Sequence, residues 1–495
     1  MPEEQESDLR KQLRKNLEDM KSRGFDPYKT YRYDRTHSST EVASQYSDIG
    51  SDRSEDLISV AGRIMAKRIH GKAGFADLVD REGKVQIYFR RDDIGDDLWD
   101  LFQTMDRGDV VGVNGNVFRT KTGEITIAVT GFQVLSKALI PLPEKFHGLQ
   151  DVQMRYRQRY LDLLMNEDVR TRFIKRSRMI AHMRAWLNEK GFIEVETPIL
   201  QPLYGGALAR PFVTHHNFLD IDLYLRIAPE LYHKRCIVGN LEGVYEIGKN
   251  FRNEDIDAQH YPEYTSMELY KAYSDYNDIM DLTESLIHDT AMQIVGTEKI
   301  VYGDRILDFT RPWPRITMDE AIKKHSGLDV STLDTLESAK DAAREMGVRE
   351  VDDCSDIGKV VSEIFDQKVQ PCLIDPVFII DHPIEVSPLA KRKRGAPHLV
   401  ERFELFINGW EFANAFSELN DPVEQEQRFK EQDRLKQEGD DEAHPIDLDY
   451  VRALEYGLPP TGGLGIGIDR LAMIFTNAPS IKEVILFPHM RPDIA

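Results

Sequence analysis

Cysteine is scarce in this 495-residue chain, which contains three. Cys236, Cys354 and Cys372 are far apart and include no CxxC pair, which argues against a disulfide framework and against a zinc knuckle. Long apolar runs are lacking too, because no stretch approaches the ~18 residues that a membrane span requires. The opening residues, MPEEQESDLRKQLRK, lack the apolar segment of a secretory signal. We therefore expect a cytoplasmic protein that does not bind membranes.

Basic side chains are in the minority, since 64 Lys and Arg stand against 85 Asp and Glu and the formal net charge is −21. Taken alone, this excess of acid argues against a nucleic-acid partner, because neutralising phosphates requires cations. Residues 10–23 and 63–72 are nevertheless locally basic, and so is the run 391–394. For the first two, a nucleic-acid surface and a solvated face are both open. For the run, a loop that attracts a phosphate-bearing substrate and a plain solvated loop are both open.

The first third of the chain predicts a helix followed by a small β-barrel. Residues 8 to about 23 have the apolar spacing of an amphipathic helix, which we expect to end at Gly24. Residues 28–55 are polar and rich in serine. Between residues 57 and 137, short alternating segments are separated by turn residues, and one helix-like segment, DDLWDLFQTM, lies between the third and the fourth. Five strands with one helix match an OB-fold, whose strand face commonly binds single-stranded nucleic acid.

The most informative stretch is VYEIGKNFRNEDIDAQHYPEYTSMELY, residues 244–270, which predicts two antiparallel strands joined by a long loop. Alternation of period two places Tyr264, Ser266, Glu268 and Tyr270 on one face of the second strand. The same count places Glu246, Gly248, Asn250 and Arg252 together on the first strand. An arginine, carboxylates and phenols on one sheet surface predict a binding site. The alternative is an ordinary β-hairpin with a solvated loop.

A second hairpin is predicted at Asn408-Gly409, which lies between two apolar-rich runs. A two-residue turn there would pair Phe406 with Glu411, so that Glu404 and Glu411 share a face. Two carboxylates side by side repel each other, but they suit a Mg²⁺ ion carried by a nucleotide.

Asn414, Phe416 and Glu418 also share a face, but strict alternation would put them opposite Glu411. A bulge near Phe412 and Ala413, or a strong strand twist, would bring the two groups into one pocket. We favour the bulge, because bulges are frequent beside active sites.

The segment TGGLGIGIDR near the C-terminus alternates Gly463, Gly465 and Gly467 with apolar residues. The glycine side of such a strand leaves bare backbone for a ligand, and the apolar side packs on a following helix. A phosphate-binding glycine loop is disfavoured, because the segment contains neither GxxxxGK[ST] nor GxGxxG.

Three of these motifs together, FRNE with HYPEYTSMELY, RIAPELY, and GLGIGIDR, resemble class II aminoacyl-tRNA synthetases, and in detail the lysyl-tRNA synthetase family. The helix at residues 169–191 and a strand at 192–200 containing Pro198 are similar to the first signature of that class, a dimer-interface element. The resemblance implies an α+β protein with an OB-fold barrel followed by a catalytic domain on an antiparallel sheet flanked by helices. The expected divisions are 1–55 for an N-terminal helix and polar extension, 56–140 for the anticodon-binding barrel, 141–165 for a linker and 166–495 for the catalytic domain.

The implied reaction is the ATP-dependent activation of L-lysine to lysyl-adenylate, followed by transfer of lysine to tRNA(Lys). An aspartyl or asparaginyl synthetase and a synthetase-like paralogue are the alternatives. The family's partners are ATP, L-lysine, tRNA(Lys) and a second copy of the chain in a homodimer, with no role for DNA. A pocket for an ε-ammonium requires a carboxylate and hydrogen-bond acceptors, which Glu418 and Tyr270 supply, whereas an aspartate pocket would require a cation.

The resemblance also assigns roles to residues of this sequence. It implies catalytic roles for Arg252 and Arg470. The implied ATP-binding residues are Arg252, Glu254, His260, Tyr264, Gly465, Gly467 and Arg470. The implied lysine-binding residues are Gly206, Glu230, Glu268, Tyr270, Asn414, Phe416 and Glu418. Glu404 and Glu411 would hold Mg²⁺, and Phe75, Gln86 and Arg68 would bind the anticodon. Two departures from the family pattern are Asp255 in place of a glycine and Gln259 in place of a basic residue.

Overall fold

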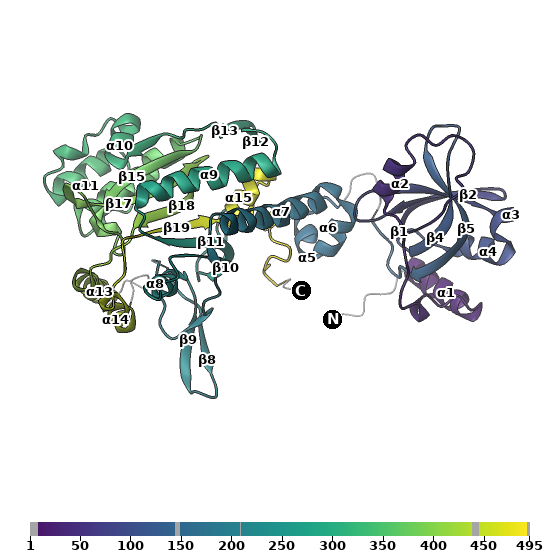
Figure 1. Cartoon of the computed structure of the whole chain (residues 1–495), viewed down its shortest axis with the longest axis horizontal. Coiled ribbons are helices and arrows are strands. Elements are labelled where there is room, and N and C mark those ends of the chain that lie inside the picture. Colours follow the sequence, from purple (N-terminus) through teal and green to yellow (C-terminus); the bar gives the residue numbers. More distant parts are fainter. Residues whose placement is uncertain (1–7, 144–148, 208, 438–444, 493–495) are drawn as a thin grey trace. The chain divides into compact units, whose positions relative to one another are not determined.

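The computed structural model describes residues 8–143, 149–207, 209–437 and 445–492. The chain forms two compact units, Met1–Gly148 and Leu149–Ala495 (Figure 1). Within the described residues, no helix is both long and apolar enough to cross a membrane.

The first unit contains a closed β-barrel with the strand order β1-β2-β3-β5-β4. Its strands are β1 (Leu57–His70), β2 (Ala73–Val79), β3 (Lys84–Arg90), β4 (Val110–Arg119) and β5 (Ile125–Ser136). Two short helices, α3 (Arg91–Ile94) and α4 (Asp96–Thr104), lie between β3 and β4. Buried side chains alternate along β2 and β3 as expected for strands with one face in a core. The predicted OB-fold is therefore confirmed.

Helix α1 (Asp8–Ser22) precedes the barrel, and Gly24 follows it with a φ of 86°. Such a left-handed residue just after a helix is usually glycine, because a Cβ is strained there. Helix α2 (Ser39–Gln45) begins with a capping box between Ser38 and Glu41. Val42 of α2 and Tyr46 pack into the barrel core, so part of the polar stretch 28–55 belongs to the folded body of this unit.

The second unit is built on one large sheet with the order β14-β15-β17-β18-β19-β11-β10-β6, and β16 pairs with β17. The strands are β6 (Ile193–Glu194), β10 (Gly243–Phe251), β11 (Glu263–Ala272), β14 (Arg315–Thr317), β15 (Val377–Pro383), β16 (Arg392–Lys393), β17 (Ala396–Ile407), β18 (Trp410–Ser417) and β19 (Thr461–Gly467). Adjacent strands pair antiparallel, except that β14 and β6 pair parallel at the two edges. The predicted antiparallel sheet is therefore confirmed for the strands between the edges.

Helices pack on the apolar face of this sheet. The helices of the unit are α5 (Val152–Arg157), α6 (Arg159–Met165), α7 (Glu167–Glu189), α8 (Glu230–Val238), α9 (Tyr276–Ile294), α10 (Met318–Ser326), α11 (Leu336–Glu345), α12 (Ile357–Ile364), α13 (Pro422–Gln437), α14 (Leu448–Glu455) and α15 (Ile468–Phe475). Side chains of α7, α9 and α15 form one buried core with Met267, Leu269, Leu464 and Ile466 of the sheet. Their neighbours along the strands consequently point to the opposite face, where a ligand site can form.

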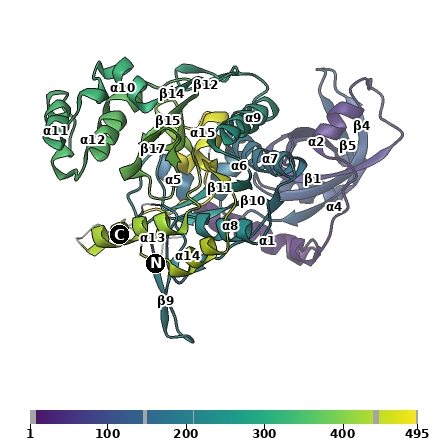
Figure 2. The same ribbon diagram turned by 60° about the vertical axis from the view of Figure 1, so that its left-hand side comes forward.

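Two parts project from this body. Helices α10, α11 and α12 gather beside the sheet (Figure 2), and they share a second apolar cluster with Val377, Ile379 and Phe406 of β15 and β17. A small sheet of β7 (Leu200–Gln201), β8 (Val213–His216) and β9 (Ile221–Leu225) carries a hairpin that extends away from the body (Figure 1). A separate hairpin consists of β12 (Lys299–Tyr302) and β13 (Arg305–Asp308).

The strand expected over residues 192–200 is wrong in its extent. Only Ile193–Glu194 pairs with the large sheet, and Leu200–Gln201 joins the small one. Between them Pro198 has no N–H for a ladder, and Thr197 donates both its N–H and its hydroxyl to the Glu246 carboxylate. These side-chain contacts replace the strand pairing that alternation predicted.

Candidate active site

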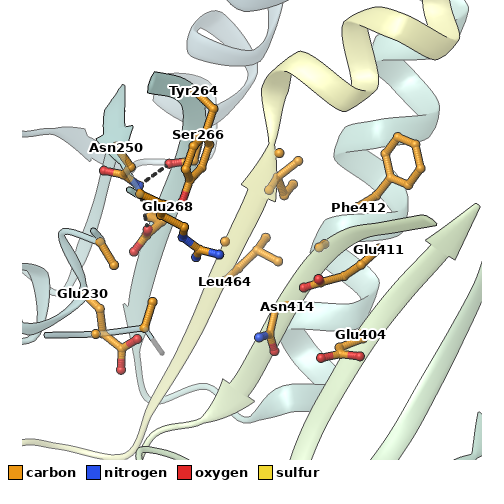
Figure 3. A pocket seen from close by; sticks show the side chains of 18 of the residues that line it. Glu230, Asn250, Tyr264, Ser266, Glu268, Glu404, Glu411, Phe412, Asn414 and Leu464 are labelled. Atoms are coloured by element: carbon orange, nitrogen blue, oxygen red, sulfur yellow. Dashed lines mark hydrogen bonds between the residues drawn. The ribbon is translucent and has the colours of Figure 1, made fainter. Parts of the chain in front are cut away.

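The polar face of the sheet begins with β10 and β11, which form the predicted antiparallel pair. Glu246 lies opposite Glu268, and Gly248 lies opposite Ser266. The Asn250 amide donates to Ser266 Oγ at 2.7 Å and to Glu268 Oε1 at 3.5 Å (Figure 3). The expected alternation of these strands is therefore confirmed, and it aims carboxylates and amides into one space.

That space is a cavity of about 390 Å³. Most of the residues singled out from the sequence line it: Gly206, Glu230, Arg252, Glu254, His260, Tyr264, Glu268, Tyr270, Glu404, Glu411, Asn414, Phe416, Gly465, Gly467 and Arg470. They come from α8, β11, β17, β18, β19, α15 and adjoining loops, so residues more than 200 positions apart in the sequence meet here. Glu418 does not line the cavity, because its side chain is fully buried beside it.

The hairpin of β17 and β18 turns at Asn408 and Gly409, which have φ values of 54° and 75°. Both central residues of a type I′ turn require positive φ, and the turn pairs Phe406 with Glu411 as predicted. The register then shifts, so that Leu405 pairs with Ala413 and Phe412 is the extra residue. The predicted bulge is confirmed. Figure 3 shows its result, in which Glu404, Glu411 and Asn414 lie close together.

Arg402 organises this end of the cavity and was not singled out from the sequence. Its guanidinium forms an ion pair with Glu404 and donates to Asn414 Oδ1 at 3.1 Å and to Ser387 Oγ at 3.0 Å. Burial, followed by the charge of Glu404, raises the pKa of the Glu411 carboxyl. The charges of Arg470, Arg402 and Arg252 oppose this shift, but of the two carboxylates only Glu404 forms a salt bridge among the described residues, with Arg402. Alternation along β17 could have found Arg402, because it lies two residues before Glu404 on the same face.

His260 connects the loop after β10 to α15. Arg470 donates to His260 Nε2 at 3.1 Å, and His260 Nδ1 lies 2.7 Å from Asp257 Oδ2. Because arginine has no acceptor, Nε2 must be unprotonated and Nδ1 must carry the hydrogen. The same Asp257 accepts the backbone N–H groups of Gln259 and His260, both at 2.6 Å. The loop residue Asp257, which the sequence analysis missed, therefore sets the orientation of the imidazole.

The glycines of β19 leave room on the polar face. A Cβ added at Gly465 or Gly467 would meet side-chain atoms only at ordinary contact distances. At Gly463 the same atom would lie 1.9 Å from Glu418 Oε1 and 2.5 Å from the Tyr270 ring. The first two glycines thus open the cavity, whereas Gly463 allows a carboxylate and a phenol to approach the backbone.

Lys234 is the largest omission of the sequence analysis. Its side chain is fully buried, and its ammonium forms ion pairs with Glu230 and Glu418, at 2.5 Å in the case of Glu230 Oε1. Burial alone would lower the pKa of Lys234, but the charges of Glu230 and Glu418 outweigh it and raise that pKa. The signal in the sequence was the i, i+4 spacing of Glu230 and Lys234 on one helix.

The barrel carries the remaining predicted residues on one outer face. Arg68 of β1 lies opposite Phe75 of β2, which lies opposite Tyr88 of β3. The rings of Phe75 and Tyr88 are 4.8 Å apart, and both residues are partly exposed. Phe75 is not a member of the barrel core. Gln86 follows on the same face, where its amide oxygen accepts a hydrogen bond from Thr126 at 3.0 Å. Aromatic plates beside a cation and an amide suit an unpaired base.

The basic run 391–394 is engaged within the protein. Lys391 donates to Asn420 Oδ1 at 2.8 Å, and Arg392 pairs with Glu424 at 2.7 Å. Lys393 pairs with Asp381, and Arg394 bridges Asp275 and Glu401. These side chains are neighbours of carboxylates and an amide of the same unit, and none of them lines the 390 Å³ cavity among the described residues.

Comparisons with known proteins agree with this arrangement. Residues 151–491 match the family model of the class II tRNA synthetases (D, K and N), and residues 58–135 match that of the OB-fold nucleic acid binding domain. A lysine–tRNA ligase of Bacillus subtilis is 52% identical over 97% of this chain and 96% of its own length. A lysine–tRNA ligase of Clostridium acetobutylicum is 50% identical over 98% of this chain and 94% of its own. The chain therefore belongs to the class II tRNA synthetases.

Proposed function

We propose that this chain is a lysine–tRNA ligase, which activates L-lysine with ATP and transfers it to tRNA(Lys). The observation that carries the proposal is the identity of 50–52% with lysine–tRNA ligases over nearly the whole chain. The cavity favours lysine over the acidic or amide substrates of the related D and N enzymes. Glu230 and Glu268 line it and Glu418 lies beside it, and such carboxylates attract an ammonium and repel a carboxylate side chain.

The chemistry needs no side-chain nucleophile. The lysine carboxylate attacks the α-phosphorus of ATP, the bond from that phosphorus to the bridging oxygen breaks, and pyrophosphate leaves. A ribose hydroxyl at the 3′ end of the tRNA then attacks the carbonyl carbon of the adenylate, and AMP leaves. We assign the binding and orientation of the reacting groups to Arg252 and Arg470, whose fixed charges stabilise the transition state. Both guanidinium groups belong to residues that line the cavity.

The ATP site in this proposal uses the other cavity residues. The guanidinium carbon of Arg252 lies over the Tyr264 ring, 5.4 Å from the ring centroid, and the ring offers a flat surface. Gly465 and Gly467 leave the sheet open, so an adenine or ribose can approach the backbone. Glu254 and His260 lie on the loop between β10 and β11, where they would contact the triphosphate or the adenine.

The donor set of Glu404 and Glu411 fits Mg²⁺, because both are carboxylates and only Glu404 is paired with a cation in the described part of the chain. The raised pKa of Glu411 indicates that the pair would gain from an added cation. We propose that these two residues hold Mg²⁺ together with ATP. When bound, the ion would offset the charge of the phosphates. The chain's own contribution is to hold the two carboxylates on one face through the turn at Asn408 and Gly409, which pairs Phe406 with Glu411.

For tRNA recognition we propose that the outer face of the barrel binds the anticodon. Phe75 and Tyr88 would stack on bases, while Gln86 and Arg68 would contact a base edge and a phosphate. Tyr88 is added to the residues expected from the sequence because its ring lies directly against Phe75. Locally basic residues thus serve RNA binding in a chain of net charge −21.

We further propose that two copies associate through the face formed by β6 to β9. Apolar side chains are exposed there, including Ile193 at 48%, Leu200 at 47% and Val213 at 59%. Such a concentration of exposed apolar residues is typical of an interface. Light scattering should give twice the mass of the chain, and Leu200→Glu should lower the measured mass.

Because its tRNA product serves protein synthesis, we propose that the protein works in the cytoplasm.

The activity is tested by ATP–pyrophosphate exchange with each of the twenty amino acids, followed by charging of tRNA(Lys). We expect exchange with lysine and none of comparable rate with the others. Exchange driven by aspartate or asparagine would reassign the chain to a related synthetase. Exchange with lysine but no charging of any tRNA would favour a paralogue that uses another acceptor.

A further inference from the structure

The ammonium of Lys234 occupies a cage whose walls include Glu230, Tyr270 and Phe416, which also line the cavity. Its Nζ lies 5.8 Å from the ring centroid of Phe416, 5.9 Å from that of Tyr270 and 6.0 Å from that of Tyr450. Carboxylates of Glu230 and Glu418 contact it from two sides. Acidic oxygens with aromatic faces are the surroundings that an ammonium prefers. Lys234 itself does not line the cavity.

The contact with Lys234 leaves part of the hydrogen-bonding capacity of the Glu418 carboxylate unsatisfied. Its Oε2 forms the ion pair with Lys234, and apart from that ion pair neither of its two buried oxygens has a hydrogen-bond partner among the described residues. Oε1 lies against the bare backbone of Gly463 and beside the Tyr270 ring, both of which line the cavity. A buried carboxylate oxygen without a donor is costly, so its persistence points to a cation that arrives with the substrate.

The charges around the cage do not balance without a ligand. Glu230, Glu268 and Glu418 supply three negative charges when ionised, and Lys234 supplies one positive charge. Glu246 is already paired with Arg226 and His233 and does not enter the count. Because burial raises the pKa of Glu268 to about 8, the excess at neutral pH comes mainly from Glu230 and Glu418. The α-ammonium of any amino acid would pair with one carboxylate, and the ε-ammonium of lysine would add a positive charge that a monoamino acid, such as glutamine or methionine, cannot supply.

We infer that Lys234 is a positioning residue that determines specificity for a diamino acid, because it binds one oxygen of Glu230 and one of Glu418 and keeps both carboxylates ionised for the two ammonium groups of the substrate. This inference rests on the proposed activation of lysine. Glu230 would receive the α-ammonium and Glu418 the ε-ammonium, so Lys234 acts through both without touching the substrate. Its role differs from packing, since an apolar residue of the same size would fill the cage but not neutralise it.

Removing the charge should couple substrate binding to protons. Burial already raises the pKa of Glu418, and Lys234 opposes that shift; the same holds for Glu230. Without Lys234 the pKa of both carboxyls would rise further, and the binding of lysine would release protons from them. The titratable groups that face Lys234 are Glu230 of α8, Tyr270 of β11, Glu418 after β18 and Tyr450 of α14. The charge of Glu268 acts on Glu418, and that of Arg402 acts on Glu230.

The test is the KM for lysine in ATP–pyrophosphate exchange between pH 6.5 and 8.5, with Lys234→Met compared with the unmodified protein. Burial raises the pKa of Glu268 to about 8, so the lysine KM of the unmodified protein should itself depend on pH. The quantity to compare is the additional pH dependence in the variant. At pH 7 the lysine KM of K234M should be at least about tenfold higher than that of the unmodified protein. As the pH rises, the lysine KM of K234M should decrease more steeply, by up to about an additional tenfold per pH unit, as expected for a carboxyl that must ionise. The KM for ATP should stay within about threefold.

Lys137→Met is the matched control, because Lys137 is also fully buried between two carboxylates but belongs to the barrel. It should leave the pH dependence of the lysine KM unchanged. If K234M raises the lysine KM by the same factor at every pH, or raises the KM of ATP equally, Lys234 acts through packing and the inference is overturned. Absence of lysine-dependent exchange in the unmodified protein would instead overturn the proposed function.

Lys234→Arg provides a second test and replaces K234M if that variant does not fold. Arginine keeps the positive charge, so the pH dependence of the lysine KM should match that of the unmodified protein even if the KM itself changes. An added pH slope in K234R would show that the charge at this position is not what keeps Glu230 and Glu418 ionised, and would contradict the inference.

Discussion

The two units each bury a lysine between two carboxylates, but they treat it differently. In the barrel, Lys137 binds both oxygens of Asp109 at 2.9 Å, and those oxygens also accept the backbone N–H groups of Asp106 at 2.8 Å and Ala138 at 2.9 Å. In the second unit, Glu418 forms an ion pair with Lys234 through Oε2, and neither of its buried oxygens has another hydrogen-bond partner among the described residues. In the first cluster both carboxylate oxygens of Asp109 accept hydrogen bonds within the described chain, whereas in the second cluster the Glu418 carboxylate retains unused acceptor capacity. A buried charge that is fully satisfied stabilises the fold, and one with a spare acceptor indicates a ligand.

The largest expected effect tests whether the catalytic unit alone performs activation. Arg252→Ala removes a fixed charge from the cavity, and the rate of lysine-dependent exchange should fall on the order of 10³-fold. Binding of tRNA to the barrel should be little changed. The control is Arg305→Ala, since Arg305 is exposed and bonds only to Asn408 among the contacts described. Near-normal exchange by R252A would remove Arg252 from the centre of the site.

Glu418→Gln probes the spare acceptor itself. The substitution keeps size and hydrogen-bonding capacity but leaves both Lys234 and the ε-ammonium of the substrate short of a charge. Breaking a buried pair typically costs about 3–5 kcal/mol, so the KM for lysine should rise by roughly 150- to 4,000-fold. The KM for ATP, measured in the same exchange assay, should change little. An unchanged lysine KM would show that Glu418 is a structural partner of Lys234 and no more, as Asp109 is of Lys137.

Lys137→Met should produce the opposite profile. Asp106 and Asp109 would lose their buried cation, and the free energy of unfolding of the barrel should fall by about 3–5 kcal/mol. Exchange without tRNA should be unaffected. Denaturant unfolding followed by the fluorescence of Trp99, which lies in the barrel core, measures the first quantity. A loss of lysine activation in K137M would show that the two clusters are not separate in function.

The smallest effect is expected on the surface of the barrel. Phe75→Ala removes a stacking plate worth about 1–3 kcal/mol per base, so the KM for tRNA in charging should rise roughly 5- to 150-fold. Exchange without tRNA should stay the same. Tyr31→Ala is the control, because Tyr31 is the same kind of exposed aromatic residue, at 97% exposure, outside the proposed face. Equal damage to exchange and charging would assign Phe75 to the stability of the barrel.

Local patterns predicted those parts of the fold in which alternation and turn chemistry agree. The pairing of residues 244–270 followed from alternation, and the turn at Asn408-Gly409 followed from two residues that tolerate positive φ. The bulge at Phe412 could be predicted because strict alternation placed Glu411 and the group of Asn414 and Phe416 on opposite faces of the strand, whereas a single pocket required them on the same face. The strand at residues 192–200 failed because side chains of distant residues, above all Glu246, satisfied its backbone.

The missed residues are those whose role depends on contacts between distant segments. Lys234 looks like an ordinary helical partner of Glu230, and only the fold brings Glu418, 184 positions away, to its other side. Arg402 and Asp257 likewise act on residues supplied by other segments or by a loop conformation. Tyr88 became visible once the pairing of β2 and β3 placed it against Phe75. Composition and motifs cannot report such neighbours.

The bulge at Phe412 divides β18 into two half-strands that are out of step by one residue. Before it, Glu411 faces the cavity, and after it Asn414 and Phe416 do so, while Phe412 and Ala413 both turn toward the core. Deleting one residue here would restore strict alternation along β18. Either Glu411, or Asn414 and Phe416, would then point toward the core, and core side chains would point into the cavity. The carboxylate that we propose for the nucleotide and the residues that we propose for the amino acid are therefore brought to one face by a single extra residue. This position should tolerate a change of side chain far better than a change in chain length.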